Sequence, residues 1–231
     1  MDVVIPEPDK LKIVNHRQYH TSEHLSPTSV LPSPLDQFRK WFTEVQGKVD
    51  EPEAMSLSTA TSKGVPSSRF VLLKQADKKG FVFYTNYTSR KSSELEENAY
   101  AALAFYWKAV HRQVRVVGKV EKVSREESEE YFSSRPVGSR LGAWASDQSK
   151  PVGENEVRDK LEEAKAKFAV DEDTENAQVP LPDHWGGWRV VPIEIEFWAG
   201  KPSRLHDRIR YLRVEGSPDD APEWKIDRLA P

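Results

Sequence analysis

The stretch Arg204-Leu205-His206-Asp207-Arg208 is the part of the sequence best suited to chemistry. It follows a strand-like stretch, and in an extended chain Arg204, His206 and Arg208 would share one face. Two guanidinium groups beside an imidazole suit a phosphorylated or otherwise anionic ligand, and the imidazole can titrate near neutral pH. The alternative is a charged edge strand that prevents unwanted pairing. The five residues alone do not decide between the two interpretations.

Cations also stand where other predicted elements begin or end. Arg69 and Lys74 flank the apolar run 70–73, which predicts core or near-core residues between two surface charges with apolar stems. Arg90 and Lys91 open a predicted helix, where the helix dipole usually favours acidic residues. This departure favours a phosphate site, built from backbone N–H donors and two cations, over a simple surface role.

A third candidate site has a spacing of four residues. Tyr131, Arg135 and Ser139 recur at this interval, and the first two would be neighbours on one helical face. Pro136 is expected to end that helix, so Ser139 would come from the next turn. A phenol, a guanidinium and a hydroxyl together suit a phosphomonoester, whereas a Tyr–Arg stack near a helix end is the structural alternative.

Composition limits the possible functions. The 231 residues include 34 basic and 37 acidic side chains, a net charge of −3, which argues against a general nucleic-acid binder. The absence of cysteine excludes disulfides and thiolate metal sites. No apolar run approaches the roughly 18 residues of a membrane span. The acidic N-terminal stretch has no signal-peptide pattern, so we expect a cytoplasmic protein without membrane attachment.

Periodicity predicts many strands with few helices between them. Residues 1–33 have no clear period and are interpreted as a mobile arm. Leu35 begins a helix, with Pro34 in its first turn, and Ser124 opens another through a capping box. Strands are expected at 54–61, 69–74, 81–85, 101–107, 113–123 and from 188 onward, helices at 138–147 and 154–170, and a loop at 179–187. This order favours an antiparallel barrel over a βαβ fold.

The motif Trp198-x5-Arg204-Leu205-His206-Asp207-Arg208, followed by the ending at 228–231, resembles the C-terminal signature of the pyridoxine (pyridoxamine) 5′-phosphate oxidase family. The resemblance runs from about residue 34 to residue 231. It implies a mainly β fold with peripheral helices, the FMN-binding split β-barrel, as a single oxidase domain over 34–231. It also implies a homodimer with FMN at the subunit interface, which periodicity does not show.

The resemblance assigns a role to each candidate residue. It implies FMN contacts from Arg69, Phe70, Val71, Leu72, Tyr84, Thr85, Arg90, Lys91, Gln113, Gln148, Ser149, Trp198 and Arg208. It implies substrate contacts from Lys74, Tyr131, Arg135, Ser139, Arg204, Leu205 and His206, with Arg204 and His206 as the catalytic residues. No metal is expected. Arg17-Gln18-Tyr19 is the best match to the family's N-terminal segment that covers the substrate.

The implied reaction oxidises pyridoxine 5′-phosphate or pyridoxamine 5′-phosphate with O2 to pyridoxal 5′-phosphate, releasing H2O2 and, from the amine, ammonia. Three other functions stay open at this point. The chain could be a split-barrel flavoprotein with another substrate, a carrier of pyridoxal 5′-phosphate, or a phosphate-binding module without flavin. The combined substrate residues argue against the first, and Gln113 and Trp198 against the last.

Overall fold

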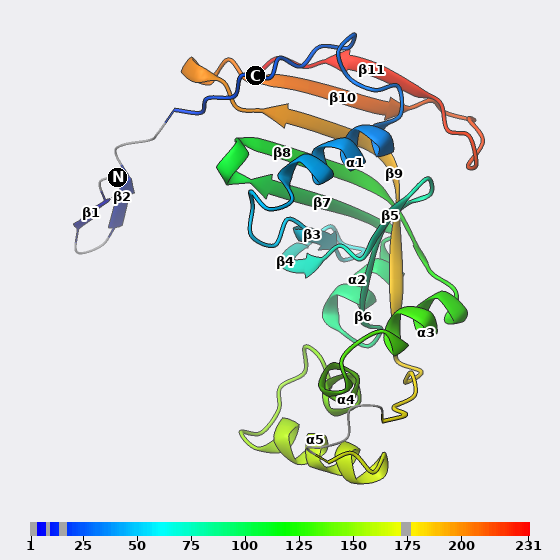
Figure 1. Cartoon of the computed structure of the whole chain (residues 1–231). Helices are drawn as coiled ribbons and strands as arrows, with labels where there is room; N and C mark the ends of the chain where they lie inside the picture. Colours follow the sequence, from blue (N-terminus) through cyan, green and yellow to red (C-terminus); the bar gives the residue numbers. More distant parts are fainter. Residues whose placement is uncertain (1–3, 8–9, 14–17, 172–176) are drawn as a thin grey trace. The chain divides into compact units, whose positions relative to one another are not determined.

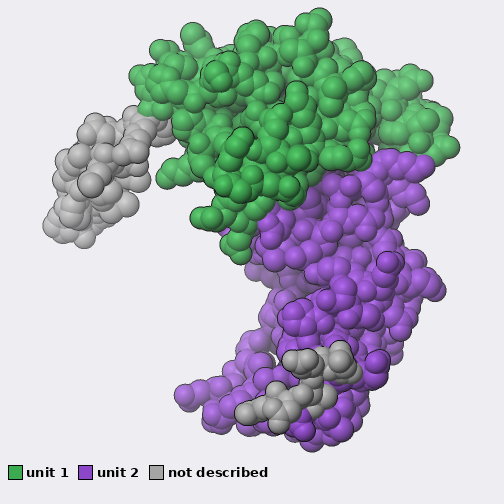
Figure 2. Space-filling model, in the orientation of Figure 1, with its two compact units in different colours: residues 1–52, 104–115, 194–231 green, residues 53–103, 116–193 purple. Residues whose placement is uncertain are grey.

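The computed structural model describes residues 4–7, 10–13, 18–171 and 177–231 (Figure 1). The chain divides into two compact units, which Figure 2 colours separately. Unit 1 comprises residues 1–52, 104–115 and 194–231, and unit 2 comprises residues 53–103 and 116–193. The expectations of one domain over 34–231 and of a mobile arm over 1–33 stay predictions.

Unit 1 is built from antiparallel strands and one long helix. The second half of β9 (Trp185–Ala199) pairs with β10 (Asp207–Arg213), which pairs with β11 (Trp224–Arg228). The remaining elements are the paired strands β1 (Val4–Glu7) and β2 (Lys10–Ile13), α1 (Pro34–Val45), the end of β7 (Tyr100–Trp107), the start of β8 (Arg112–Lys122), and 3₁₀ turns at Lys108–Val110 and Pro202–Arg204.

Unit 2 combines antiparallel strand pairings with short helices. β3 (Ala54–Ala60) pairs with β4 (Pro66–Leu72), and β6 (Gly80–Asn86) pairs with both β5 (Gln75–Asp77) and the first half of β9. Its helices are α2 (Arg90–Glu97), α3 (Arg125–Ser133), α4 (Val137–Ala145) and α5 (Glu156–Lys167). None of the helices in the described part of the chain has the length and hydrophobicity of a membrane span.

The helix predicted from Leu35 is confirmed as α1. Pro34 occupies its first turn, and the Ser33 side chain caps it by accepting a hydrogen bond from the Asp36 N–H. Phe38 and Trp41 lie on its buried face. The Phe38 ring lies 5.1 Å from Phe105 and the Trp41 ring 5.2 Å from Phe197, which gives unit 1 an aromatic core.

The helix start predicted at Ser124 is confirmed, but only the serine half of the capping box is seen, because the Glu127 carboxylate accepts a hydrogen bond from Arg189 instead. The Ser124 hydroxyl accepts a hydrogen bond from the Glu127 N–H at 3.0 Å, and α3 ends at Ser133, before Pro136. The helices predicted at 138–147 and 154–170 correspond to α4 and α5.

The loop predicted at 179–187 extends too far, because β9 already begins at Trp185. The strand includes Gly186 and Gly187, although glycine usually marks a turn. In the structure, Gly187 pairs with Tyr84 of β6. A Cβ on Gly187 would lie 2.6 Å from Val123 and 2.8 Å from the Tyr84 ring, so the glycine permits close packing within a strand.

The prediction for 69–74 is wrong in its bounds and in its burial. β4 runs from Pro66 to Leu72, and only Leu73, after the strand, is buried. Phe70 is 78% exposed and Leu72 is 40% exposed. β4 ends the strand order and pairs only with β3 among the described strands, and these two apolar side chains are partly open to solvent.

Candidate functional site

A cavity of about 770 Å³ in unit 2 brings together most of the predicted site residues. Its walls come from β4, β6, the first turn of α2, the α3–α4 region and the segment after α4. The predicted residues that line it are Arg69, Phe70, Val71, Leu72, Lys74, Tyr84, Thr85, Arg90, Lys91, Tyr131, Arg135, Ser139, Gln148 and Ser149. Four other lining residues are not among those predicted from the sequence: Ser67, Ser68, Pro136 and Trp185.

Lys91 lies at the start of α2 and is only 8% exposed. Its ammonium donates hydrogen bonds to Gln148 Oε1 at 2.8 Å, Thr85 Oγ1 at 3.2 Å and Ser89 Oγ at 3.3 Å. These acceptors are all neutral, and no carboxylate among the described residues pairs with the ammonium. Burial, and secondarily the charge of Arg69, lowers the pKa of Lys91 to about 8. The buried cation therefore has hydrogen-bond partners but no counter-charge.

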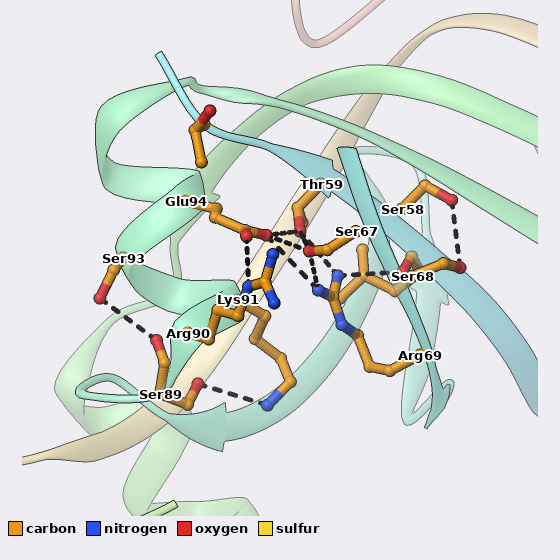
Figure 3. Close-up of polar contacts among 12 residues, drawn as sticks. Ser58, Thr59, Ser67, Ser68, Arg69, Ser89, Arg90, Lys91, Ser93 and Glu94 are labelled. Carbon is orange, nitrogen blue, oxygen red and sulfur yellow. Dashed lines mark hydrogen bonds and ion pairs between the residues drawn. The ribbon is translucent and has the colours of Figure 1, made fainter. Parts of the chain in front are cut away.

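Arg69 and Arg90 share the carboxylate of Glu94 (Figure 3). Arg90 Nε donates to Glu94 Oε1 at 2.8 Å, and Arg69 Nη2 lies 3.4 Å from Oε2. The hydroxyls of Thr59 and Ser67 donate to the same Oε2. Burial alone would raise the pKa of Glu94, but hydrogen bonds from Ser67, Thr59 and Arg90 lower it to about 2. The sequence signal for this pairing was available, because Glu94 follows Arg90 by four residues.

Three stacked rings form another wall of the cavity. The centroids of Tyr84 and Tyr131 lie 4.1 Å apart, and those of Tyr84 and Trp185 lie 5.5 Å apart in nearly parallel planes. The guanidinium of Arg135 lies over the Trp185 ring, 4.7 Å from its centroid. Its Nη1 is buried and has no hydrogen-bond partner among the described residues. An anion in the cavity would satisfy this donor.

The remaining predicted residues belong to unit 1. Gln113, Trp198 and Arg208 line a cavity of about 270 Å³ together with Glu196. Arg208 donates to both carboxylate oxygens of Glu196, from Nε at 2.7 Å and from Nη2 at 3.1 Å. The structure thus brings these three predicted flavin contacts together, with Arg208 held in place by a buried carboxylate.

Arg204 and His206 line another unit 1 cavity, of about 590 Å³, with Gln18, Tyr19, Lys201 and Ser203. The chain is not extended throughout 204–208, so the condition for a shared face of Arg204, His206 and Arg208 is not met. Arg204 belongs to a 3₁₀ turn, has a positive φ of 61°, and precedes β10, which begins only at Asp207. Arg208 therefore lines a different cavity from Arg204 and His206, with which it would share a face in an extended chain. Leu205 is 69% exposed and lines neither of these cavities.

The imidazole of His206 is held in one orientation. The Lys201 backbone N–H donates to His206 Nδ1 at 3.1 Å, so the neutral ring carries its proton on Nε2. Burial, followed by the charges of Arg204 and Arg208, lowers the pKa of His206 below its ordinary value. The ring is therefore neutral at pH 7 and can donate one hydrogen bond from Nε2.

Tyr19 packs against the same imidazole. Its ring centroid lies 5.2 Å from that of Trp198 and 5.7 Å from that of His206, both edge to face. Arg17, the cation of the segment singled out in the sequence, lies outside the described residues.

Comparison with known proteins adds independent information. The family model for pyridoxamine 5′-phosphate oxidase matches residues 42–179, and the model for the pyridoxine 5′-phosphate oxidase C-terminal dimerisation region matches residues 185–231. The chain is 49% identical to a pyridoxine/pyridoxamine 5′-phosphate oxidase of Nostoc punctiforme, over 95% of this chain and 98% of that protein. It is also 49% identical to one of Bordetella petrii, over 96% of this chain and 100% of that protein.

Solved structures confirm the predicted fold class. PhzG of Burkholderia lata, solved in complex with tetrahydrophenazine-1-carboxylic acid, is 31% identical and aligns with a TM-score of 0.79, covering 90% of this chain and 98% of that chain. A pyridoxamine 5′-phosphate oxidase-related, FMN-binding protein of Nostoc punctiforme, 14% identical, aligns with a TM-score of 0.67 over 86% of this chain and 98% of that chain. The fold is thus the mainly β split barrel with peripheral helices, and the chain belongs to the pyridoxine/pyridoxamine 5′-phosphate oxidase family.

Proposed function

We propose that this protein oxidises pyridoxine 5′-phosphate and pyridoxamine 5′-phosphate with O2 to pyridoxal 5′-phosphate, with FMN as its cofactor. One observation carries the proposal beyond family membership. The unit 2 cavity contains two separate cationic groups without full counter-charge, one around Lys91 and one at Arg135. Two phosphates, one on the cofactor and one on the substrate, would match these two groups.

The residues at the start of α2 fit the phosphate of FMN. Lys91 has no carboxylate partner, and the terminal nitrogens of Arg90 have no hydrogen-bond partner among the described residues. Arg69 is more restricted, because both of its terminal nitrogens donate to protein acceptors. We therefore assign direct phosphate contact to Arg90 and Lys91, and to Arg69 mainly a charge near the site. Thr85, Gln148 and Ser149 line the same cavity, and Gln113, Trp198 and Arg208 are the proposed flavin contacts of unit 1.

Tyr131, Arg135, Ser139 and Lys74 are the proposed ligands of the substrate phosphate. The unpaired Nη1 of Arg135 supports this role, because a phosphate oxygen would supply the acceptor it lacks. Arg204 and His206 are proposed to hold the pyridine ring. The neutral His206 can donate from Nε2 to a ring substituent, while the Lys201 N–H holds Nδ1.

FMN, when bound, supplies the redox chemistry by accepting two electrons with the hydrogen from the C4′ carbon of the substrate and passing them to O2, which becomes H2O2. The residues of this chain orient the two molecules and neutralise their phosphates, and accurate orientation can provide much of the rate. For the amine substrate, hydrolysis of the resulting imine releases ammonia.

We infer that the active protein is a homodimer with FMN at the subunit interface. The C-terminal match to a dimerisation region supports this inference. The exposed Phe70 and Leu72 on β4 support it too, because a second subunit or the cofactor would cover them. Sedimentation of the flavin-loaded protein as a monomer would contradict the dimer. The cytoplasmic location stays a prediction.

An absorbance spectrum tests the proposed activity. The purified protein, loaded with FMN, receives pyridoxine 5′-phosphate without oxygen and is then exposed to air. We expect the flavin band to bleach with substrate and to recover in air. A flavin band that the substrate does not bleach would indicate a flavoprotein with another substrate. Failure to bind FMN at all would leave a carrier or phosphate-binding module as the better explanation.

A further inference from the structure

Glu94 lies behind the proposed phosphate site and does not line its cavity. Its side chain, on α2, is only 4% exposed. Figure 3 shows the carboxylate joined by dashed lines to the guanidinium groups of Arg69 and Arg90, with hydroxyls of Thr59 on β3 and Ser67 on β4 pointing to it. Four donors thus reach the two oxygens, so the buried carboxylate is fully satisfied.

The two oxygens of Glu94 have different partners. Oε2 joins Thr59, Ser67 and Arg69 into one cluster across the β3–β4 pair. Within the described part of the chain, Oε1 accepts only from Arg90 Nε, at 2.8 Å. The Arg90 side chain is 62% exposed, and among the described residues this hydrogen bond is the polar contact that restrains it. Without it, this long side chain in the cavity lining would sample many rotamers.

The net charge of the cluster also depends on Glu94. Arg69, Arg90 and Lys91 contribute three positive charges and Glu94 one negative charge, which leaves a net charge of +2. A phosphomonoester carries about −1.5 to −2 at neutral pH. The carboxylate therefore lets three cations gather at one helix end while the net charge still matches a phosphate dianion.

We propose that Glu94 is a positioning residue for the cofactor phosphate: through Oε1 it orients Arg90 so that both terminal nitrogens of the guanidinium are presented to the phosphate. The inference rests on the proposed FMN site. It assigns to Glu94 no contact with the cofactor, and it predicts that the effect of Glu94 depends on the presence of Arg90.

The experiment compares FMN with riboflavin, which lacks the phosphate. The protein is freed of flavin and titrated with each compound while flavin fluorescence is followed, for wild type, Glu94→Gln, Arg90→Ala and the double variant. We expect Glu94→Gln to weaken FMN binding about tenfold, as is usual for residues that orient a ligand contact, and to leave riboflavin binding unchanged. In the Arg90→Ala background, the same substitution should change FMN affinity by less than about twofold.

Glu96→Gln is the matched control, since Glu96 lies on the same helix in an exposed pair with Lys122. It should leave both affinities unchanged. Equal weakening of FMN and riboflavin binding by Glu94→Gln would mean that Glu94 only stabilises unit 2, and would overturn the proposal. An undiminished effect in the Arg90→Ala background would also overturn it.

Two outcomes separate this inference from the proposed function. Wild-type protein that binds riboflavin as tightly as FMN has no phosphate site at α2, which would refute the cofactor assignment itself. Wild-type protein that prefers FMN, with a Glu94→Gln variant that behaves identically, would refute only the role of Glu94. If Glu94→Gln does not fold, Glu94→Asp replaces it, because aspartate keeps the charge but cannot reach Arg90; the same selective loss of FMN affinity is expected.

Discussion

Replacing Arg135 with methionine should change stability and activity in opposite directions. The Arg135 guanidinium lies over Trp185, and its buried Nη1 has no hydrogen-bond partner among the described residues. Such a donor lowers the stability of the substrate-free protein, but it is available to a phosphate. Methionine retains an unbranched, apolar stem that can pack on the Trp185 ring.

The expected stability change follows from two opposing contributions. An unsatisfied buried donor costs about 1–3 kcal/mol, while the cation–π contact with Trp185 returns about 0.5–1 kcal/mol. Arg135→Met should therefore raise the free energy of unfolding of the substrate-free protein by about 1 kcal/mol. The activity should fall, because two charge-assisted hydrogen bonds at about 1.5 kcal/mol each correspond to roughly a 100-fold loss of kcat/KM.

Urea unfolding without substrate and steady-state H2O2 production measure the two effects. Arg158→Met is the control, because Arg158 is an exposed arginine on α5 with an expected change near zero in both assays. A lower stability together with an unchanged kcat/KM would refute the reasoning, because Arg135 would then be a structural arginine. Loss of FMN from the variant would refute its assignment to the substrate phosphate.

Other substitutions and conditions give further expected outcomes. Lys91 has a pKa of about 8 in the flavin-free protein and loses its charge as the pH rises through that value. FMN affinity should therefore fall above about pH 8, while riboflavin affinity stays constant. Lys91→Met should abolish the pH dependence of FMN affinity. His206→Ala should lower kcat/KM about 100-fold with FMN still bound, and flavin loss during gel filtration would contradict the division of roles. Asp207→Asn should lower the free energy of unfolding in urea by about 3 kcal/mol, because Asp207 is buried and pairs with Arg228 at 2.6 Å.

Local signals predicted the helices well. Pro34 and the spacing of Phe38 and Trp41 are enough to predict α1, because a first-turn proline and an apolar face are properties of the helix itself. The hydroxyl of Ser124 predicts the start of α3 for the same reason. In each case the interactions that determine where the helix begins lie within a few residues along the chain.

The candidate site was predictable only in part, because its parts come from distant segments. The helix start indicated a phosphate site at Arg90 and Lys91, and the four-residue spacing indicated one at Arg135. The resemblance to a family then assigned the ligands, and the structure brings the three cations to one cavity. Glu94 and Trp185 were missed. The role of each depends on residues that are distant in sequence. Glu94 pairs with the guanidinium of Arg69 on β4. Trp185 stacks with the rings of Tyr84 and Tyr131.

Phe70 and Arg204 show why a local sequence pattern does not by itself describe two of the site segments. Apolar content predicts burial, but a side chain on β4 is buried only if another layer covers it, and the sequence of one strand does not specify that layer. Alternation also assumes an extended backbone, whereas Ser203 and Arg204 both have a positive φ, a conformation uncommon outside glycine. Such backbone geometry persists only where surrounding contacts hold it, and here the Lys201 N–H bonded to His206 closes the turn. Both differences between sequence pattern and structure occur at residues that are proposed to bind a ligand. Local sequence rules are expected to fail at such sites, because a side chain there is exposed or redirected toward the ligand.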